Sequence, residues 1–294
     1  MMTSTEHGLI IDFNGNYQPS NAFDINSARR ALIFGDCVFE QIRTNASTML
    51  FFGRHLDKLC AAMTFMNMEI PKKFSSERTV LKEELTKLLI KNKIFKGGLL
   101  TLLICRTEGN DVWHQPSQVY YIAMVKRLPS VLFELNTEGL TLNIFNELTM
   151  PAARVANFNT HFGSVVKSLA LQYSRNKFTS DSFIVNSNGN LIGSAMYGNI
   201  FCVKDSVVYT PPLSEGCTDS VIRRHILDVA EILGIQTDAN TVITSEFLNV
   251  ADEIFLASTE FGLKWVIAWQ NRRYYRRTAE TIWKRLNEYY ADEF

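Results

Sequence analysis

The sequence lacks three features that would take a protein out of the soluble globular class. It has no run of about 18 apolar residues, so we expect no membrane-spanning helix. Its 30 basic side chains are balanced by 30 acidic ones, so the net charge does not favour binding to nucleic acid or to an anionic membrane. Its first residues contain no basic segment followed by an apolar stretch, so we expect no secretory signal.

Cysteine is scarce, and its five positions have neither metal-ligand spacing nor the density of a disulfide framework. Scattered cysteines in odd number fit reduced thiols in a cytoplasmic protein, where most serve as small buried hydrophobic residues. They are Cys37, Cys60, Cys105, Cys202 and Cys217.

What is present fits an ordinary globular chain. Hydrophobic residues make up 46% and charged residues 20% of the 294 positions, enough for one large domain or two smaller ones. Pro129 interrupts the pattern between two strand-rich regions. We therefore expect an N-terminal α/β domain over 1–127, a linker over 128–138 and a second domain over 139–294.

Alternating and helical periodicities together predict an α+β fold. An apolar run, an Asn-Gly turn and a returning run near the N-terminus predict a hairpin. Strands are expected over 38–43, 49–52, 98–106, 119–125, 140–145 and 251–257, and helices over 56–66, 76–93, 163–176 and 220–233. The helix over 163–176 should bury Val165, Val166, Leu169 and Tyr173.

The segment from Asp181 to Arg224 is the most distinctive part of the chain. It predicts three short strands joined by turns, followed by a helix with capping residues at its start. Asn199-Ile200-Phe201 and Tyr209-Thr210-Pro211-Pro212-Leu213 resemble the "SSNIF" and "YTPPL" motifs of the class IV aminotransferases. Further resemblances run along the chain: Phe34 to Glu40 to "YGDGVFE", His55 to Leu59 to "EHLxRL", Ser220 to Arg223 to "GITR", and Ala251 to Phe255 to "ADEVF".

The number, order and spacing of these motifs make the resemblance specific over roughly residues 8 to 270. It implies the two-domain fold of the D-amino-acid aminotransferases, with pyridoxal phosphate (PLP) bound between the domains of a homodimer. The family includes branched-chain and D-amino-acid aminotransferases and aminodeoxychorismate lyases, which act on small anionic molecules.

The resemblance also locates the family's Schiff-base lysine, which lies in a "K-S/T-L-N" motif. Counting back without gaps from Ser187-Asn188-Gly189 puts Thr160 at that place. A rival alignment uses Lys167, in Lys167-Ser168-Leu169, but the expected apolar stripe turns Lys167 toward solvent. His161 is a further candidate for the pocket or for a structural hydrogen bond.

Ser194 falls where the family has the glutamate that binds the pyridine nitrogen, counting back from Asn199. A serine forms hydrogen bonds but does not stabilise a pyridinium as an ionised carboxylate does. This replacement argues against the usual electron sink.

The family's phosphate-binding positions are altered but still polar. Lys58 replaces an arginine, keeping the charge without the bidentate fork. The other expected cofactor-binding positions are Asn199, Val221 and Ile222 at the start of a helix, and Ser258 and Thr259 at the end of a strand. Lys58 is equally consistent with an exposed helix lysine, and Ser258 and Thr259 with turn residues.

Two other segments offer weaker candidates. Arg106 and the loop Thr107–Pro116, with Trp113 and His114, fall where the family has a substrate-facing loop. The basic and aromatic residues from Asn271 to Glu288 are more typical of a solvated element than of a nucleic-acid site.

Three functions from different classes are compatible with these residues. The first is a standard PLP-dependent aminotransferase or lyase, with Lys167 as the lysine. The second is a relative without PLP catalysis that binds a small anion or a partner. The third is an enzyme with lysine-independent chemistry in the same pocket. The replacements at Thr160 and Ser194 favour the last two.

Overall fold

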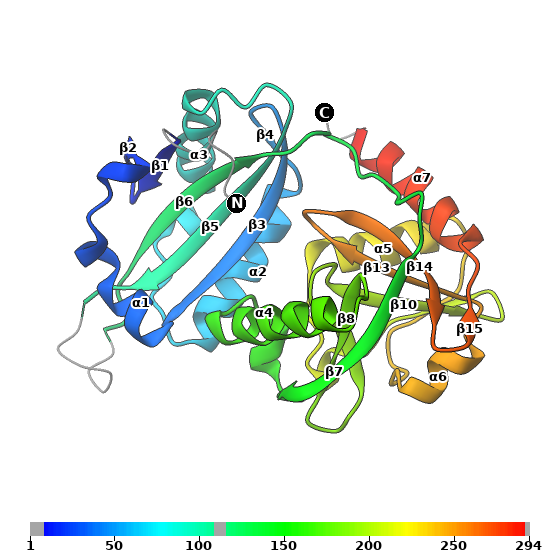
Figure 1. Ribbon diagram of the computed structural model, residues 1–294. Coiled ribbons are helices and arrows are strands. Elements are labelled where there is room, and N and C mark those ends of the chain that lie inside the picture. The colour runs from blue at the N-terminus through cyan, green and yellow to red at the C-terminus, as the bar shows by residue number, and fades with distance from the viewer. Residues whose placement is uncertain (1–8, 109–115, 292–294) are drawn as a thin grey trace. The chain divides into compact units, whose positions relative to one another are not determined.

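The computed structural model describes residues 9–108 and 116–291 (Figure 1). Contacts within the chain divide it into two compact units, one up to Val131 and the other from Leu132 to Glu293. Within the described ranges, no helix is both long and apolar enough to cross a bilayer.

The first unit is built on a six-stranded antiparallel sheet in the order β2-β1-β6-β5-β3-β4. These strands are β1 (Ile10–Phe13), β2 (Asn16–Pro19), β3 (Cys37–Asn45), β4 (Thr48–Met49), β5 (Gly97–Arg106) and β6 (Val119–Arg127). The predicted hairpin is confirmed, because Asn14 and Gly15 join β1 to β2 with φ of 53° and 95°. Strand β4 is shorter than predicted, since Phe52 already begins a helix.

Three helices belong to this unit: α1 (Arg29–Phe34), α2 (Phe52–Phe65) and α3 (Arg78–Lys91). Helix α2 contacts β3, and α3 contacts β1 and β6. Burial of Leu56, Leu59 and Met63 fixes the inner face of α2 as its helical spacing predicts.

The second unit contains a nine-stranded mixed sheet in the order β12-β11-β10-β13-β14-β7-β8-β9, with β15 paired to β14. The strands are β7 (Leu140–Met150), β8 (Asp181–Asn186), β9 (Leu191–Ser194), β10 (Asn199–Lys204), β11 (Val207–Tyr209), β12 (Thr237–Asp238), β13 (Glu253–Ser258), β14 (Gly262–Trp269) and β15 (Arg272–Arg273). The segment 181–224 thus holds four strands where three were predicted.

This sheet curls until its end strand β9 meets β10. An isolated bridge joins Ser194 to Gly198, whose carbonyl accepts a hydrogen bond from the Ser194 amide at 2.7 Å. The curl brings the turn between β9 and β10 close to the carboxyl end of β7 and the start of α4, and these segments together line a pocket.

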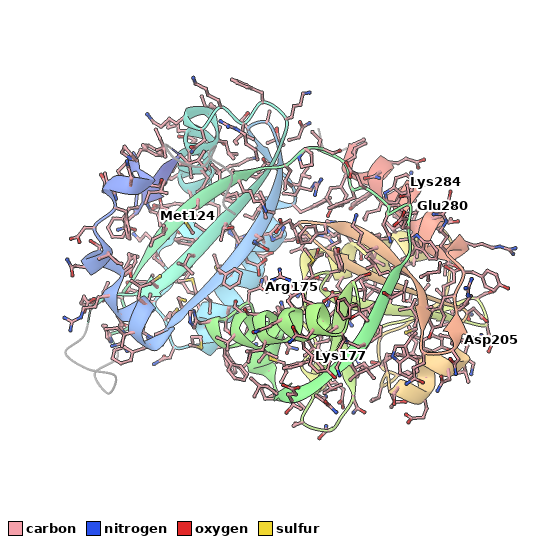
Figure 2. The ribbon with its side chains drawn as sticks, viewed as in Figure 1. Met124, Arg175, Lys177, Asp205, Glu280 and Lys284 are labelled. Carbon is pink, nitrogen blue, oxygen red and sulfur yellow. The ribbon has the colours of Figure 1, made fainter. Side chains whose placement is uncertain are left out.

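Four helices cover the second sheet: α4 (His161–Asn176), α5 (Val221–Ile232), α6 (Ser245–Val250) and α7 (Arg277–Ala291). Helix α4 contacts β7 and β8, while α5 and α7 contact each other and β13. Short 3-10 helices lie at Ser20–Ala22, Ile25–Ala28, Lys72–Phe74, Arg154–Asn157 and Leu213–Glu215. The outer face of α7 carries an exposed ion pair between Lys284 and Glu280 at 2.9 Å (Figure 2), as expected of a solvated helix.

The predicted buried stripe of α4 is wrong in part. Val166 is buried, but Val165 and Leu169 are 44% and 42% exposed. The face turned to the sheet consists instead of Val166 and small residues: Gly163, Ala170 and Ser174. Small side chains let a helix approach a sheet closely, so a stripe chosen by hydrophobicity alone missed this face.

Candidate functional site

One pocket of the second unit brings together two of the predicted site residues, Lys167 and Ser194. Its inner part measures about 30 Å³, and the pocket is partly open to solvent. Its other lining residues are Met150, Ala156, Gly163, Ile184, Ile192, Gly193, Gly198, Gly216 and Thr218. The lining is therefore mostly apolar, with one ammonium group and two hydroxyl groups and no carboxylate among the described residues.

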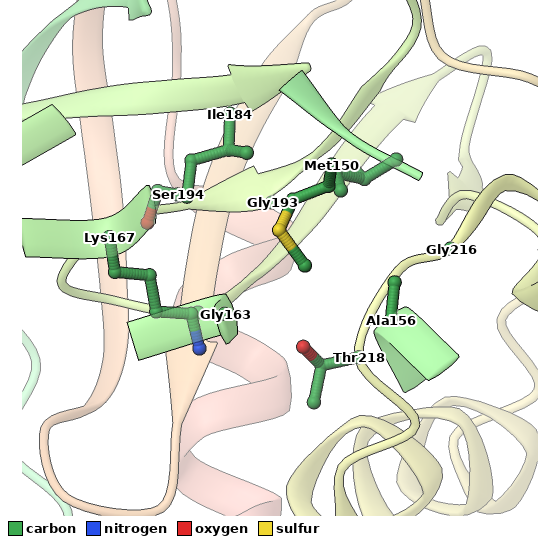
Figure 3. Close-up of a pocket in the computed structure, with 11 residues that line it drawn as sticks. Met150, Ala156, Gly163, Lys167, Ile184, Gly193, Ser194, Gly216 and Thr218 are labelled. Carbon is green, nitrogen blue, oxygen red and sulfur yellow. The ribbon is translucent and has the colours of Figure 1, made fainter. Parts of the chain in front are cut away.

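Lys167 reaches the pocket from helix α4, and Figure 3 shows its side chain extending into it. The expectation that Lys167 points to solvent is wrong. Gly163, Lys167 and Ala170 follow the i, i+4, i+7 spacing of one helix face, the face that packs on the sheet. Lys167 is accordingly half-buried.

Ser194 is 2% exposed at the end of β9, and its hydroxyl is tied to a carboxylate behind the pocket. It donates a hydrogen bond to Asp181, which also accepts from the backbone amides of Ser182 at 2.7 Å and Met196 at 3.0 Å. Burial raises the pKa of the Asp181 carboxyl, and these hydrogen bonds only partly offset the rise. Because the Ser194 hydroxyl donates its hydrogen bond to Asp181, it can only accept hydrogen bonds from its other neighbours.

Thr160 is the N-cap of α4 rather than a member of the pocket lining. Its Oγ1 accepts a hydrogen bond from the Gly163 amide at 3.4 Å, which satisfies one of the free amides of the first turn. The neighbouring His161 is exposed.

Asn199 connects the strand after the pocket to the start of helix α5. Its Nδ2 donates to the Thr218 carbonyl at 2.6 Å, and its Oδ1 accepts from the Ser220 hydroxyl. Ser220 in turn caps α5 by accepting from the Arg223 amide at 3.1 Å. This chain of hydrogen bonds fixes the wall that presents Thr218.

The other expected cofactor-binding positions of the second unit are largely engaged in packing. Val221 and Ile222 are 3% and 1% exposed, so the first turn of α5 offers apolar side chains to the core. Ser258 Oγ accepts from the Phe261 amide at 3.2 Å in a turn, and Thr259 is half-buried beside it.

The wall of the pocket contains a glycine, Gly216, at which two backbone segments approach each other closely. Gly216 has a φ of +82°, and a Cβ on it would lie 2.4 Å from the Pro151 carbonyl oxygen. A larger residue at this position would force the pocket wall outward. Glycine is therefore the residue that allows the pocket to be narrow here.

Lys58 lies in the first unit and is buried, 4% exposed, not a solvated helix lysine. Its Nζ lies 2.5 Å from Glu40 Oε1, and His55 Nδ1 lies 2.9 Å from the other carboxylate oxygen. Burial alone raises the pKa of the Glu40 carboxyl, but the Lys58 charge and the His55 hydrogen bond outweigh it, so the pKa lies below its ordinary value.

Arg106 is also buried in the first unit, where it closes a loop. It pairs with Asp36 at 3.0 Å and donates to the carbonyls of Asn67 at 3.1 Å and Pro116 at 2.9 Å. Trp113 and His114, which were named with it as candidates, lie outside the described residues.

Thr218 and Asp181 were not predicted as site residues from the sequence. Thr218 precedes a helix and looked only like a possible cap. Asp181 stands at the first position of the strand Asp181–Asn186, and a charged residue close to the apolar run Phe183-Ile184-Val185 was the available signal.

Comparison with known protein families gives a match over most of the chain. The sequence model described as "Amino-transferase class IV" matches residues 37–268. The chain belongs to the class IV aminotransferase family. D-alanine aminotransferase of Staphylococcus epidermidis is 21% identical over 251 residues, which cover 84% of this chain and 84% of that protein.

Solved structures of class IV aminotransferases have the same fold. The branched-chain aminotransferase of Thermoproteus uzoniensis with norvaline superposes with a TM-score of 0.81 at 18% identity, covering 95% of this chain and 93% of that one. The branched-chain amino acid aminotransferase of Escherichia coli gives a TM-score of 0.80 at 20% identity, covering 94% of this chain and 92% of that one. The predicted α+β class IV aminotransferase fold is thereby confirmed.

Membership of the class IV aminotransferases implies PLP, but the described residues of this pocket do not fit it. Among the residues that the structure describes, no carboxylate lines the pocket, and Thr160 uses its hydroxyl to cap a helix. We therefore assign no reaction step to PLP in this chain.

Proposed function

We propose that this class IV aminotransferase relative has lost the standard PLP chemistry of its family and binds a small anion in the pocket of the second unit. Lys167 supplies the positive charge, and Thr218 supplies a hydroxyl donor. The observation that supports this most strongly is the placement of Lys167 on the buried face of α4, in a cavity without a lining carboxylate among the described residues.

Electrostatics favour an anion over a neutral ligand. The ammonium group of Lys167 shares its small cavity with aliphatic side chains, so it lies where the dielectric response is weak. A carboxylate or phosphate oxygen of a bound anion can accept a charge-assisted hydrogen bond from it, which contributes about 1.5–3 kcal/mol.

Calorimetric titration with inorganic phosphate and with pyruvate tests this proposal. The wild-type protein should bind at least one of these anions at one site. Lys167→Met should weaken that binding by about 10- to 100-fold, the equivalent of one charge-assisted hydrogen bond. Lys167→Arg should retain part of it, because the charge is kept.

Lys177→Met is the matched control. Lys177 follows the last turn of the same helix on its exposed side (Figure 2), so removing it should leave the affinity unchanged. Equal weakening by both substitutions would point to general surface charge, and no binding by the wild type would end the proposal for these anions. Turnover of a bound anion would make the protein an enzyme with lysine-independent chemistry.

The same position of Lys167 favours a second candidate, a PLP enzyme in which Lys167 is the reactive lysine. The amine of a lysine is the group that forms a Schiff base with PLP. Borohydride trapping of PLP on the protein separates this second candidate from the first.

A further inference from the structure

Two of the five cysteines lie directly opposite each other in the sheet of the first unit. Cys37 on β3 pairs with Cys105 on β5 in the antiparallel register. Both side chains are buried, with exposed fractions of 6% and 0%. They lie outside the pocket of the second unit, so their chemistry is independent of the proposed function.

The hydrogen-bond pattern places this pair at a particular kind of site in the sheet. The Arg106 amide donates to the Asp36 carbonyl at 3.5 Å, which makes the adjacent pair of Cys37 and Cys105 a non-hydrogen-bonded one. Cα atoms at such a site are about 4.5 Å apart. Disulfides span Cα separations of about 4.4–6.8 Å, so the strands need little movement to be bridged.

The two thiols also interact with each other. Their interaction lowers the pKa of the Cys37 thiol and raises the pKa of the Cys105 thiol, and Tyr120 lies opposite Cys105 on β6. Ile11, Ala28 and Ala31 cover this row of side chains in one hydrophobic cluster. The sulfur atoms are therefore held together by the surrounding core.

We propose that Cys37 and Cys105 form a reversible intramolecular disulfide when the protein meets a peroxide. Cys37 first releases its proton to solvent, and its thiolate attacks one peroxide oxygen. The O–O bond breaks, Cys37 becomes a sulfenic acid, and the hydroxide that leaves takes a proton from solvent to form one water. The Cys105 sulfur then attacks the Cys37 sulfur, the S–O bond breaks, and the hydroxide takes the Cys105 proton as a second water. Two thiols are oxidised by two electrons, and the peroxide is reduced.

Cys37 is the first of the two to react for two reasons. It is the more exposed, and hydrogen bonding from Cys105 lowers the pKa of the Cys37 thiol despite its burial. The pKa of the Cys105 thiol is raised by the same pairing, as expected of a donor that remains protonated until the second step.

The other three cysteines have different neighbours. Cys202 on β10 lies opposite Tyr209 and Ile254, while Cys60 and Cys217 donate to the carbonyls of Phe74 and Pro211. They serve as internal controls, since a protein that oxidises without selectivity would involve them too.

The experiment treats the full-length folded protein with a small molar excess of hydrogen peroxide, unfolds it in alkylating reagent and measures intact mass and linked peptides. Two fewer of the five cysteines should be alkylated, and one linked peptide pair should contain Cys37 and Cys105. Dithiothreitol should restore all five. Cys37→Ser and Cys105→Ser should each abolish the link, whereas Cys217→Ser should keep it.

Several outcomes would overturn the proposal. They are full alkylation after peroxide treatment, a link that involves Cys60, Cys202 or Cys217, or a thiol loss that survives in Cys37→Ser. If the serine variants do not fold, the wild type still decides the matter through peptide mapping. Oxidation before and after denaturation in urea is then compared, and a Cys37–Cys105 link that forms only in urea counts against the native site.

Discussion

At the scale of single residues, buried charged groups limit which substitutions this chain tolerates. Glu40 is buried with Lys58 and His55 as its partners, and Asp181 is buried with hydrogen-bond donors alone. A buried ion pair adds little net stability, but removing one member leaves an uncompensated charge.

Replacing Lys58 should therefore destabilise the protein strongly. Lys58→Met removes the positive charge that pairs with the buried Glu40 carboxylate, so we expect a loss of about 3–5 kcal/mol in the free energy of unfolding. Urea denaturation at neutral pH measures it. Lys82→Met, at an exposed position of α3, should change the free energy by less than about 0.5 kcal/mol.

The pH dependence of stability should report the same pair. The folded-state pKa of Glu40 is lower than its ordinary value of 4.5, so its contribution is present above about 4.5 and is lost as the pH falls through the lower folded value. Stability measured from neutral pH down to about pH 3 should fall less steeply in Glu40→Gln than in the wild type. Parallel curves for the two proteins would contradict a stabilising role for the ionised carboxylate.

At the scale of elements, helix α4 determines the chemistry of the pocket. The helix itself was predictable from its periodicity and begins within two residues of the expected start. Its buried face was not, because Gly163, Ala170 and Ser174 have little hydrophobicity and are buried by close contact with β7 and β8. Lys167 was misplaced for the same physical reason.

The cap of α4 gives a test of whether Thr160 has a structural role. Thr160→Ala removes the acceptor for the Gly163 amide and should cost about 1 kcal/mol of stability. It should leave the affinity for the pocket anion unchanged. Thr281→Ala, in the exposed middle of α7, is the control and should cost nothing. A large loss of anion affinity without a loss of stability would instead place Thr160 in the site.

Other elements show where the sequence was sufficient. The hairpin at Asn14-Gly15 and the capped helix α5 were predicted because local turn and capping chemistry decides them. The curl that brings Ser194 to Gly198 was not predictable, because it depends on contacts between strands β9 and β10 that no local pattern encodes.

At the scale of the whole molecule, the family resemblance predicts a homodimer, which we retain as a proposal. Apolar side chains near α1 support it: Ile25, Leu32 and Ile33 are 65%, 58% and 59% exposed. Sedimentation analysis should give twice the chain mass of 33.5 kDa. Leu32→Asp should shift the mass toward that of a single chain, and a monomeric wild type would remove the proposal.

The fold and family of the whole chain were predictable because they rest on many motifs at once. The activity was not, because it depends on single positions. By the motif count, Thr160 and Ser194 stand where the family has its lysine and its glutamate, which stays a prediction, whereas Lys167 lines the pocket together with Ser194. The central claim is that this combination does not form the lysine-linked PLP of the standard family enzymes.

Borohydride trapping tests that claim most directly. The purified protein is mixed with PLP, its visible spectrum is recorded, and borohydride reduction is followed by peptide mass mapping, with Lys167→Met and a D-alanine aminotransferase in parallel. We predict no visible band of lysine-linked PLP and no stoichiometric adduct on the wild type, in contrast to the aminotransferase. A band with one adduct per chain at Lys167, absent from Lys167→Met, would contradict the claim and identify Lys167 as the reactive lysine.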